Sequence, residues 1–313
     1  MIRNRGDKMI VLILILEVVT RVQGGCPTRC TCTQNSLTCV QSSLESVPYF
    51  DSLANTPVII DLSGNPITYI EIDDFSFDKS HQVKEIYLNS TSLTIIDEHA
   101  FDELENLQEL YLNDNLLHYF PDEMIKKNEN MVLLDLSSNY FSEMPRIQSG
   151  SLEVLAIANS RIEGISEGAL DGLPNLRILL LQQNNLKSVN PGIFSKMSNL
   201  FFVRLAYNPW LCDCKTVELF EFLVKKRFVD NTETIQCLNE EKIFVEIPEK
   251  CTDFNNTKPR NETEEFDGDF YYVLVLFVAI FSSLVLGAIC GTCLTYKFLT
   301  RSVKITESKK TLL

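Results

Sequence analysis

The residues best suited to chemistry in this 313-residue chain are ten cysteines, eight of which fall into two groups of four. The first group is Cys26, Cys30, Cys32 and Cys39, and the second is Cys212, Cys214, Cys237 and Cys251. Even numbers of closely spaced thiols predict disulfide bonds in a secreted segment. The alternative is zinc, but the C-x3-C-x-C-x6-C spacing of the first group is not zinc-finger spacing. The cysteine spacing alone leaves three pairings open within each group.

Histidines are the other residues that could support catalysis or metal binding. The chain has three, His81, His99 and His118, and they are scattered through the stretch between the cysteine groups. They lack metal-ligand spacing, and no arrangement of a nucleophile with a base accompanies them. We therefore expect no enzymatic activity, no metal and no cofactor.

The stretch between the cysteine groups, residues 57–207, repeats the pattern L-x-x-L-x-L-x-x-N-x-L. Its seven repeats begin at Pro57, Val83, Leu107, Met131, Leu152, Leu176 and Leu200. Within x-L-x-L-x, the leucine positions face one side of a short strand and the x positions face the other. A period in the twenties with this pattern predicts an α/β leucine-rich repeat solenoid, shaped like a horseshoe, whose stacked repeats share one core and one parallel sheet.

Two further positions of each repeat are expected to be structural. The asparagine position holds Asn65, Asn115, Asn139, Asn184 and Asn208, with Thr91 and Ser160 in the second and fifth repeats. These side chains should bond buried backbone groups where the chain leaves each strand. An apolar residue eighteen positions after each repeat start should pack on the convex side: Phe75, Phe101, Ile125, Leu170 and Phe194. Ser149 stands there in the short fourth repeat, so we expect a local irregularity.

The segments outside the repeats predict a membrane protein. Residues 1–24 have a basic start and an apolar stretch, as in a cleaved signal peptide. Residues 270–296 form an uncharged apolar run long enough for a tilted transmembrane helix. A stalk with acidic residues, 253–269, precedes this run, and a tail with basic residues, 297–313, follows it. The positive-inside rule then predicts a type I single-pass protein of the plasma membrane with the repeats outside the cell.

The two cysteine groups and their neighbours resemble the caps of extracellular leucine-rich repeat proteins. The N-terminal cap, residues 25–56, carries Cys26-Pro27, Cys30-Thr31-Cys32 and Cys39, with Val47-Pro48 after them; the C-terminal cap, residues 208–252, begins Asn208-Pro209-Trp210-Leu211-Cys212-Asp213-Cys214. The resemblance implies that the first cysteine of each cap pairs with the third and the second with the fourth. The implied bonds are Cys26–Cys32, Cys30–Cys39, Cys212–Cys237 and Cys214–Cys251.

This resemblance is to a large group of single-pass adhesion molecules, receptors and channel auxiliary subunits. The chain combines one capped repeat domain, one membrane helix and a short basic tail. This layout resembles that of the auxiliary gamma subunits of large-conductance potassium channels. The chain departs from those subunits in having only scattered basic residues after the helix.

The third and fifth positions of the repeats should form the concave face of the solenoid. The first half of this face should be acidic with two stacked tyrosines, and the second half should be an exposed apolar patch, which usually marks a protein partner. The predicted partner-binding residues are Tyr87, Tyr111, Leu133, Asp135, Val154, Ala156, Ile178, Leu180, Phe202 and Arg204. The alternative is that these residues lie lower in the sheet, or that the C-terminal cap covers them.

Net charge limits the class of ligand. Between Gly25 and Asp269 there are 39 acidic and 19 basic residues, a net charge of −20. Nucleic acid and anionic polymers are therefore unsuitable ligands, whereas a basic protein surface would suit this ectodomain.

Short motifs predict several modifications and contacts. Sequons for N-glycosylation begin at Asn89, Asn255 and Asn261. In the membrane run, Ser283, Gly287 and Gly291 have the spacing of a helix-packing face that could form a homodimer or dock on a channel. Cys290 and Cys293 are candidates for palmitoylation, with small apolar helix residues as the alternative. The C-terminal sequence Thr311-Leu312-Leu313 could bind a PDZ domain.

Two functions are consistent with these features. The first is a cell-surface receptor or adhesion molecule that binds a protein through the concave face. The second is an auxiliary subunit that docks on a channel or receptor through its transmembrane helix.

Overall fold

The computed structural model describes residues 25–50, 53–228, 236–238 and 244–246. All of them belong to the first of two compact units, residues 1–260. The predicted signal peptide, stalk, transmembrane helix and tail lie outside the described residues. So do Cys251, Asn255, Asn261, Ser283, Gly287, Gly291, Cys290 and Cys293. None of the described helices has both the length and the apolar character needed to cross a membrane.

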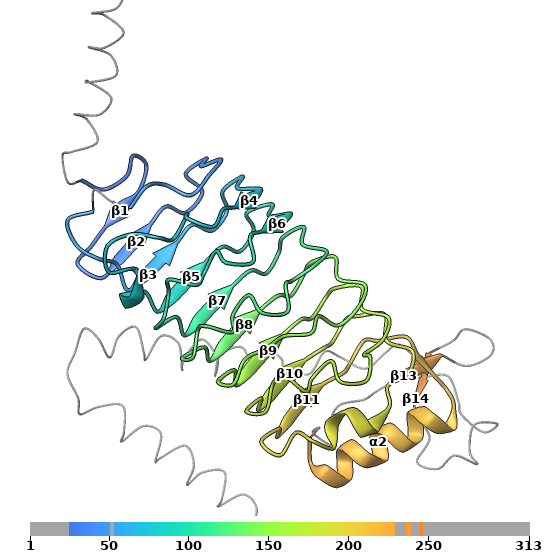
Figure 1. The fold of residues 1–313 in the computed structure, drawn as a ribbon. Helices are drawn as coiled ribbons and strands as arrows, with labels where there is room; N and C mark the ends of the chain where they lie inside the picture. The colour runs from blue at the N-terminus through green and yellow to red at the C-terminus, as the bar shows by residue number, and fades with distance from the viewer. Residues whose placement is uncertain (1–24, 51–52, 229–235, 239–243, 247–313) are drawn as a thin grey trace, which may run out of the picture. The chain divides into compact units, whose positions relative to one another are not determined.

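A nine-stranded sheet runs from the N-terminal cap to the last repeat, in the order β1-β2-β3-β5-β7-β8-β9-β10-β11 (Figure 1). The first two strands are β1 (Thr31–Cys32) and β2 (Ser36–Thr38), which pair antiparallel in the N-terminal cap. The seven repeats supply β3 (Ile59–Asp61), β5 (Glu85–Tyr87), β7 (Glu109–Tyr111), β8 (Leu133–Asp135), β9 (Val154–Ala156), β10 (Ile178–Leu180) and β11 (Phe202–Arg204). Every pair from β2 to β11 is parallel, so the cap adds an eighth strand to the seven that the repeat pattern predicts.

The repeat pattern determines the register of these strands. The middle residue of each repeat strand occupies the second leucine position of the pattern. It pairs with the same position of the neighbouring repeat; Ile86, for example, lies opposite Leu110. All seven middle residues are fully buried: Ile60, Ile86, Leu110, Leu134, Leu155, Leu179 and Val203. One repeat could not bury such a row alone, because each side chain needs neighbours above and below it.

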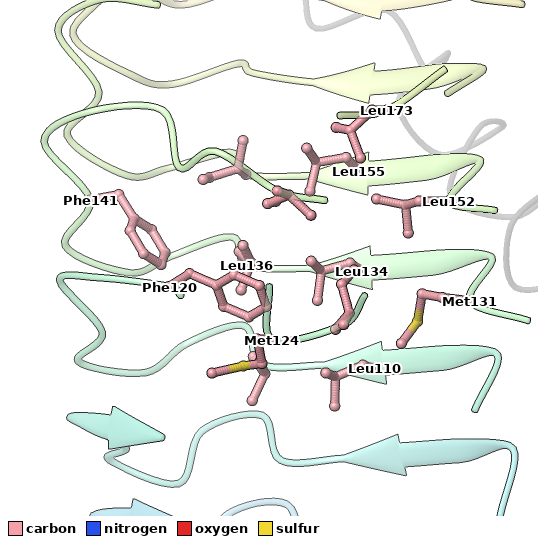
Figure 2. Packing of buried hydrophobic residues seen from close by; sticks show 14 of the residues in the cluster. Leu110, Phe120, Met124, Met131, Leu134, Leu136, Phe141, Leu152, Leu155 and Leu173 are labelled. Carbon is pink, nitrogen blue, oxygen red and sulfur yellow. The ribbon is translucent and has the colours of Figure 1, made fainter. Parts of the chain in front are cut away.

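The core lies between this sheet and the connections on the opposite side of each repeat. Figure 2 shows Leu134 and Leu155 stacked from neighbouring strands, with Phe120 and Phe141 packed against the same core from the connections. The five apolar residues predicted to pack on the convex side are buried, as expected: Phe75, Phe101, Ile125, Leu170 and Phe194. Burying one such side chain contributes about 1.5–3 kcal/mol.

The asparagine position forms a buried ladder, as the sequence predicts. The Oδ1 atom of Asn115 accepts hydrogen bonds from the backbone nitrogens of Thr91 (3.0 Å) and Leu93 (2.9 Å), and its Nδ2 donates to the carbonyls of Leu88 (2.7 Å) and Leu112 (3.0 Å). Each asparagine in the ladder thus bonds its own repeat and the repeat before it, or the N-terminal cap in the case of Asn65. The others are Asn65, Asn139, Asn184 and Asn208.

The connections differ from the α/β repeat that we expected. In the described repeats they contain turns, the short strands β4 (Tyr69–Ile70) and β6 (Ile95–Ile96), and the 3-10 helices η1 (Ser80–Gln82) and η2 (Pro191–Phe194). The α-helix in the described residues, α2 (Cys214–Lys226), belongs to the C-terminal cap. A repeat of about 24 residues leaves little chain for a full α-helix once the strand and two turns are made.

The short fourth repeat is irregular where the sequence predicts it. Ile147 supplies the buried apolar side chain there, and Ser149 is buried beside it with its Oγ accepting a hydrogen bond from the backbone nitrogen of Leu152 (3.2 Å). The fifth repeat approaches so closely that a Cβ atom added at Gly172 would overlap the carbonyl oxygen of Ile147.

Disulfides hold both caps. Cys26 is bonded to Cys32 and Cys30 to Cys39 in the N-terminal cap. In the C-terminal cap Cys212 is bonded to Cys237, which makes three of the four pairs that the family resemblance implies. Cys214 is also disulfide-bonded, and its expected partner Cys251 lies outside the described residues.

The C-terminal cap closes the core beyond β11. Its elements are α2 and the strands β12 (Trp210–Leu211), β13 (Gln236–Leu238) and β14 (Phe244–Glu246). Asp213 caps α2 by accepting a hydrogen bond from the backbone nitrogen of Thr216 (2.9 Å). Trp210 is fully buried, donates from Nε1 to the carbonyl of Leu205 (3.2 Å) and meets Phe220 edge to face. Apolar side chains thereby cover the last repeat.

Candidate protein-binding face

The candidate site is the outer face of the nine-stranded sheet, which we call the open face. It is formed by the first and third residues of each repeat strand, whose side chains alternate with the buried middle residue. The strands lie where the sequence predicts them. The open face therefore consists of Ile59, Asp61, Glu85, Tyr87, Glu109, Tyr111, Leu133, Asp135, Val154, Ala156, Ile178, Leu180, Phe202 and Arg204.

The apolar half of the open face spans β8 to β11. Register places Val154, Ile178 and Phe202 side by side in one row, and Ala156 beside Leu180 in the next. Our expectation of an exposed patch is wrong for Leu133 and Ala156, which are both buried, with 8% exposure; for these two the alternative, a lower place in the sheet, is the correct one. Strands about 4.8 Å apart place Glu109 and Val154 on either side of Leu133, and Asp135 and Leu180 on either side of Ala156. Val154, Ile178, Leu180 and Phe202 remain half-buried.

Two exposed apolar residues that we did not predict border this half. Val132 and Phe201 directly precede β8 and β11, and both are exposed. The guanidinium carbon of Arg177 lies 5.5 Å from the centre of the Phe201 ring, and Arg177 also pairs with Glu153 at 3.1 Å. Both residues occupy the second position of their repeat. A large apolar residue at that position is the sequence signal that could have identified them.

The acidic half of the open face spans β3 to β8 and contains a tyrosine pair. The rings of Tyr87 and Tyr111 stack with centroids 4.5 Å apart and planes 5° apart. The hydroxyl of Tyr87 donates to Oε2 of Glu85 (3.0 Å), and that of Tyr111 donates to Oε2 of Glu109 (2.8 Å). The stacking that the sequence predicts is present, and the two carboxylates hold both hydroxyls in place.

Partial burial shifts the pKa values of this half. Burial is the main reason that the pKa of Glu109 lies above its usual range; the nearby charge of Glu85 raises it further, and the hydrogen bond from Tyr111 opposes the rise. Burial likewise raises the pKa of Tyr87 and Tyr111, with the neighbouring glutamates adding to the effect. The pKa of Asp135 is raised by burial, against the hydrogen bonds that it accepts from Ser137. These groups lie in a partly dehydrated surface, where a partner could displace the remaining water.

Asn89, the predicted glycosylation site within the repeats, lies just beyond β5. Its sequon includes Thr91, which is fully buried. The Thr91 hydroxyl donates to the carbonyl of Leu88 (2.8 Å) and lies 2.9 Å from Oδ1 of Asn115. The sequon therefore overlaps the structural ladder.

The histidines do not come together. Nδ1 of His99 lies 3.0 Å from Oδ2 of Asp102 on the surface, and the ring of His118 stacks on Tyr140 at 5.3 Å. His81 follows Ser80 in η1. In the part of the chain that the structure describes, no three residues of the types that bind metals converge on one point.

Comparisons with known proteins agree with this fold. A family model described as "Leucine rich repeat" matches residues 58–117 and 150–209. The crystal structure of human 5T4 (Wnt-activated inhibitory factor 1, trophoblast glycoprotein) is similar with a TM-score of 0.53 and 21% sequence identity, over 70% of this chain and 93% of that chain. At that identity the likeness shows a shared fold alone. No curated protein sequence matches the chain. The repeat match and the shared fold support a leucine-rich repeat protein with disulfide-bonded caps.

Proposed function

We propose that the chain is a cell-surface receptor or adhesion molecule that binds a protein partner through the open face. The observation that carries the proposal is the row Val154, Ile178 and Phe202, which lies in register on three adjacent strands. These side chains face away from the core, so the fold does not need them to be apolar. A partner that covered them would remove apolar surface from water at about 25 cal/mol for each Å².

The surroundings of this row support a protein ligand. The tyrosine pair lies on the same sheet, and tyrosine is enriched at residues that dominate binding energy. Disulfides in both caps are expected in an oxidising compartment outside the cell. The predicted signal peptide and transmembrane segment, residues 1–24 and 270–296, would place this domain on the plasma membrane as a type I protein.

The experiment begins with proximity labelling of the full-length chain in its native tissue, followed by purification of the captured protein. Binding of that protein to cells that display the chain is then measured for the wild type, Leu180→Arg and Ser188→Arg. Leu180 lies on the open face, and Ser188 is an exposed residue elsewhere in the same repeat. We expect Leu180→Arg to abolish binding and Ser188→Arg to leave it unchanged.

The alternative function, an auxiliary subunit that docks through its membrane helix, is tested in the same assay. The double substitution Gly287→Leu with Gly291→Leu would disrupt close packing of that helix. Loss of binding in this variant, with normal binding by Leu180→Arg, would reject the open face as the binding surface and favour the auxiliary subunit.

A further inference from the structure

A second surface of the domain carries exposed apolar side chains that neither the fold nor the open face explains. Tyr69, Ile95 and Tyr119 are 40%, 60% and 68% exposed. We call these three residues the outer row. Tyr69 and Ile95 face each other in register in the parallel strands β4 and β6, and Tyr119 holds the same position in the next repeat. Figure 1 shows β4 and β6 on the connections, away from the nine-stranded sheet.

The later repeats show that this position does not have to be apolar. It lies four residues after the asparagine position of each repeat, and in repeats four to six it holds Glu143, Gly164 and Ser188. The next residue along the chain supplies the buried side chain instead, as Ile70, Ile96 and Phe120 do in the first three repeats. The apolar character of the outer row therefore adds nothing to the core, and exposed apolar residues that gather in one place mark interaction sites.

Carboxylates lie close to the outer row in the sequence of every repeat that forms it. Glu71 follows Tyr69 by two residues, Asp97 follows Ile95 by two, and Asp122 follows Tyr119 by three. Ile72, beside Glu71, is also exposed and extends the apolar surface.

Negative charge is also concentrated in the part of the domain that contains the outer row. Residues 45–123 contain 17 acidic residues and two lysines, a net charge of −15. Residues 124–228 contain ten acidic and 12 basic residues, a net charge of +2. The outer row thus lies in the strongly negative half of the domain, which attracts cationic partners and repels acidic ones.

We propose that the outer row, Tyr69, Ile95 and Tyr119, is a docking site for a basic segment of a partner protein that also carries aliphatic or aromatic side chains. The apolar side chains would cover the row, and arginine or lysine side chains would pair with the carboxylates beside it. A second copy of this chain fits poorly, because two such surfaces would bring their carboxylates together. The site is separate from the open face, so the proposal does not depend on the function proposed above.

The test uses the full-length chain in phosphatidylcholine nanodiscs and a fluorescein-labelled peptide of five Arg-Leu repeats. Binding is measured by fluorescence anisotropy, with empty nanodiscs subtracted. Matched peptides carry serine in place of leucine, or glutamate in place of arginine. We expect the Arg-Leu peptide to bind at least fivefold more tightly than the serine peptide and the glutamate peptide not to bind.

Variants of the chain then locate the site. Ile95→Ser and Tyr119→Ser place a small polar residue in the outer row, as Ser188 does in the sixth repeat, and each should raise the Kd of the Arg-Leu peptide at least fivefold. Tyr207→Ser, at an exposed tyrosine near the C-terminal cap, and Leu180→Arg, on the open face, should not. Melting temperatures equal to that of the wild type would show that the variants fold; Tyr119 lies outside β6, so its variant stays informative if Ile95→Ser unfolds.

Three outcomes would overturn the proposal. Equal binding of the Arg-Leu and serine peptides would show that charge alone attracts them. Unchanged binding by the folded Tyr119→Ser chain would place the peptide elsewhere. Self-association of the wild-type chain that Tyr119→Ser abolishes, without any effect on the peptide, would assign the row to a second copy of the chain.

Discussion

The hydroxyl oxygen of Thr91 lies 2.9 Å from Oδ1 of Asn115, so the ladder residue of the second repeat is joined directly to that of the third. Threonine is shorter than asparagine, and the backbone nitrogen of Thr91 donates a hydrogen bond to the same Oδ1 atom (3.0 Å). Asn115 therefore serves two ladder positions, and the stability of the second repeat should depend on the third.

Removing the Asn115 amide should be among the most damaging single changes in the repeats. Asn115→Ala would leave buried backbone groups in two repeats unbonded, and we expect a loss of about 2–4 kcal/mol in the free energy of unfolding. Asn185→Ala is the matched control: Asn185 is exposed in its repeat, and its substitution should change stability by less than about 0.5 kcal/mol. Denaturant unfolding measures both, and equal losses would contradict the role given to the ladder.

Glycosylation of Asn89 should occur only before the domain folds. The enzyme must engage the sequon threonine, but Thr91 is fully buried and hydrogen-bonded once the repeats have stacked. Folded, unglycosylated chain should therefore resist modification at Asn89 by oligosaccharyltransferase with a lipid-linked oligosaccharide, whereas a peptide spanning residues 84–96 should be modified. Mass spectrometry distinguishes the two, and a glycan added to the folded chain would contradict the burial of Thr91.

Substitutions in this sequon should separate the glycan from the ladder. Thr91→Val removes both the sequon and the buried hydroxyl, and should cost about 1–2 kcal/mol because the Leu88 carbonyl loses the hydroxyl as a hydrogen-bond donor. Asn89→Gln removes only the sequon and should leave the intrinsic stability within about 0.5 kcal/mol. Thermal unfolding of both variants, produced without glycans, provides the comparison.

The raised pKa of Glu109 gives the stability of the domain a definite dependence on pH. The folded state holds the proton more tightly than the unfolded chain, so stability must fall as the pH rises from the ordinary value of 4.5 through the raised folded pKa. Glu109→Gln keeps an oxygen for the Tyr111 hydroxyl and removes the titration. We expect the wild type to lose stability relative to this variant over that window.

The measurement is thermal unfolding of both proteins from pH 4 to pH 7. Asp135 also has a raised pKa but is present in both proteins, so its contribution cancels in the difference. Parallel stability curves would show that the burial of Glu109 has no energetic consequence.

Gly172 should tolerate no side chain, because the fourth repeat is short. A Cβ atom at residue 172 would overlap the Ile147 carbonyl oxygen, so Gly172→Ala should destabilise the domain by about 1–3 kcal/mol. Gly164 has no atom within 4 Å of its Cβ position and provides the control; Gly164→Ala should be neutral or slightly stabilising. A matching melting temperature for the two variants would show that the contact between the repeats can relax freely.

Much of this fold could be predicted from the sequence because the same pattern recurs in every repeat and each repeat must pack against its neighbours. The positions of the seven repeat strands, β3, β5 and β7 to β11, follow from the leucine pattern, since each strand needs its middle residue buried and its neighbours one period away. The asparagine ladder follows for the same reason, because the backbone groups that leave each strand cannot remain unbonded. The family resemblance added the cysteine pairing, which spacing alone left open.

Other features depended on the tertiary structure, because they arise between repeats and not within one. Leu133 and Ala156 are apolar residues at outward positions, yet adjacent strands bury them. The sequence likewise showed Thr91 only as a substitute in the ladder; its bond to Asn115 depends on how two repeats stack. The outer row also became visible only when exposure was known, since Tyr69 and Ile95 could have belonged to the core. The repeat pattern determines which backbone positions recur, whereas packing between neighbouring repeats decides which side chains remain available to a partner.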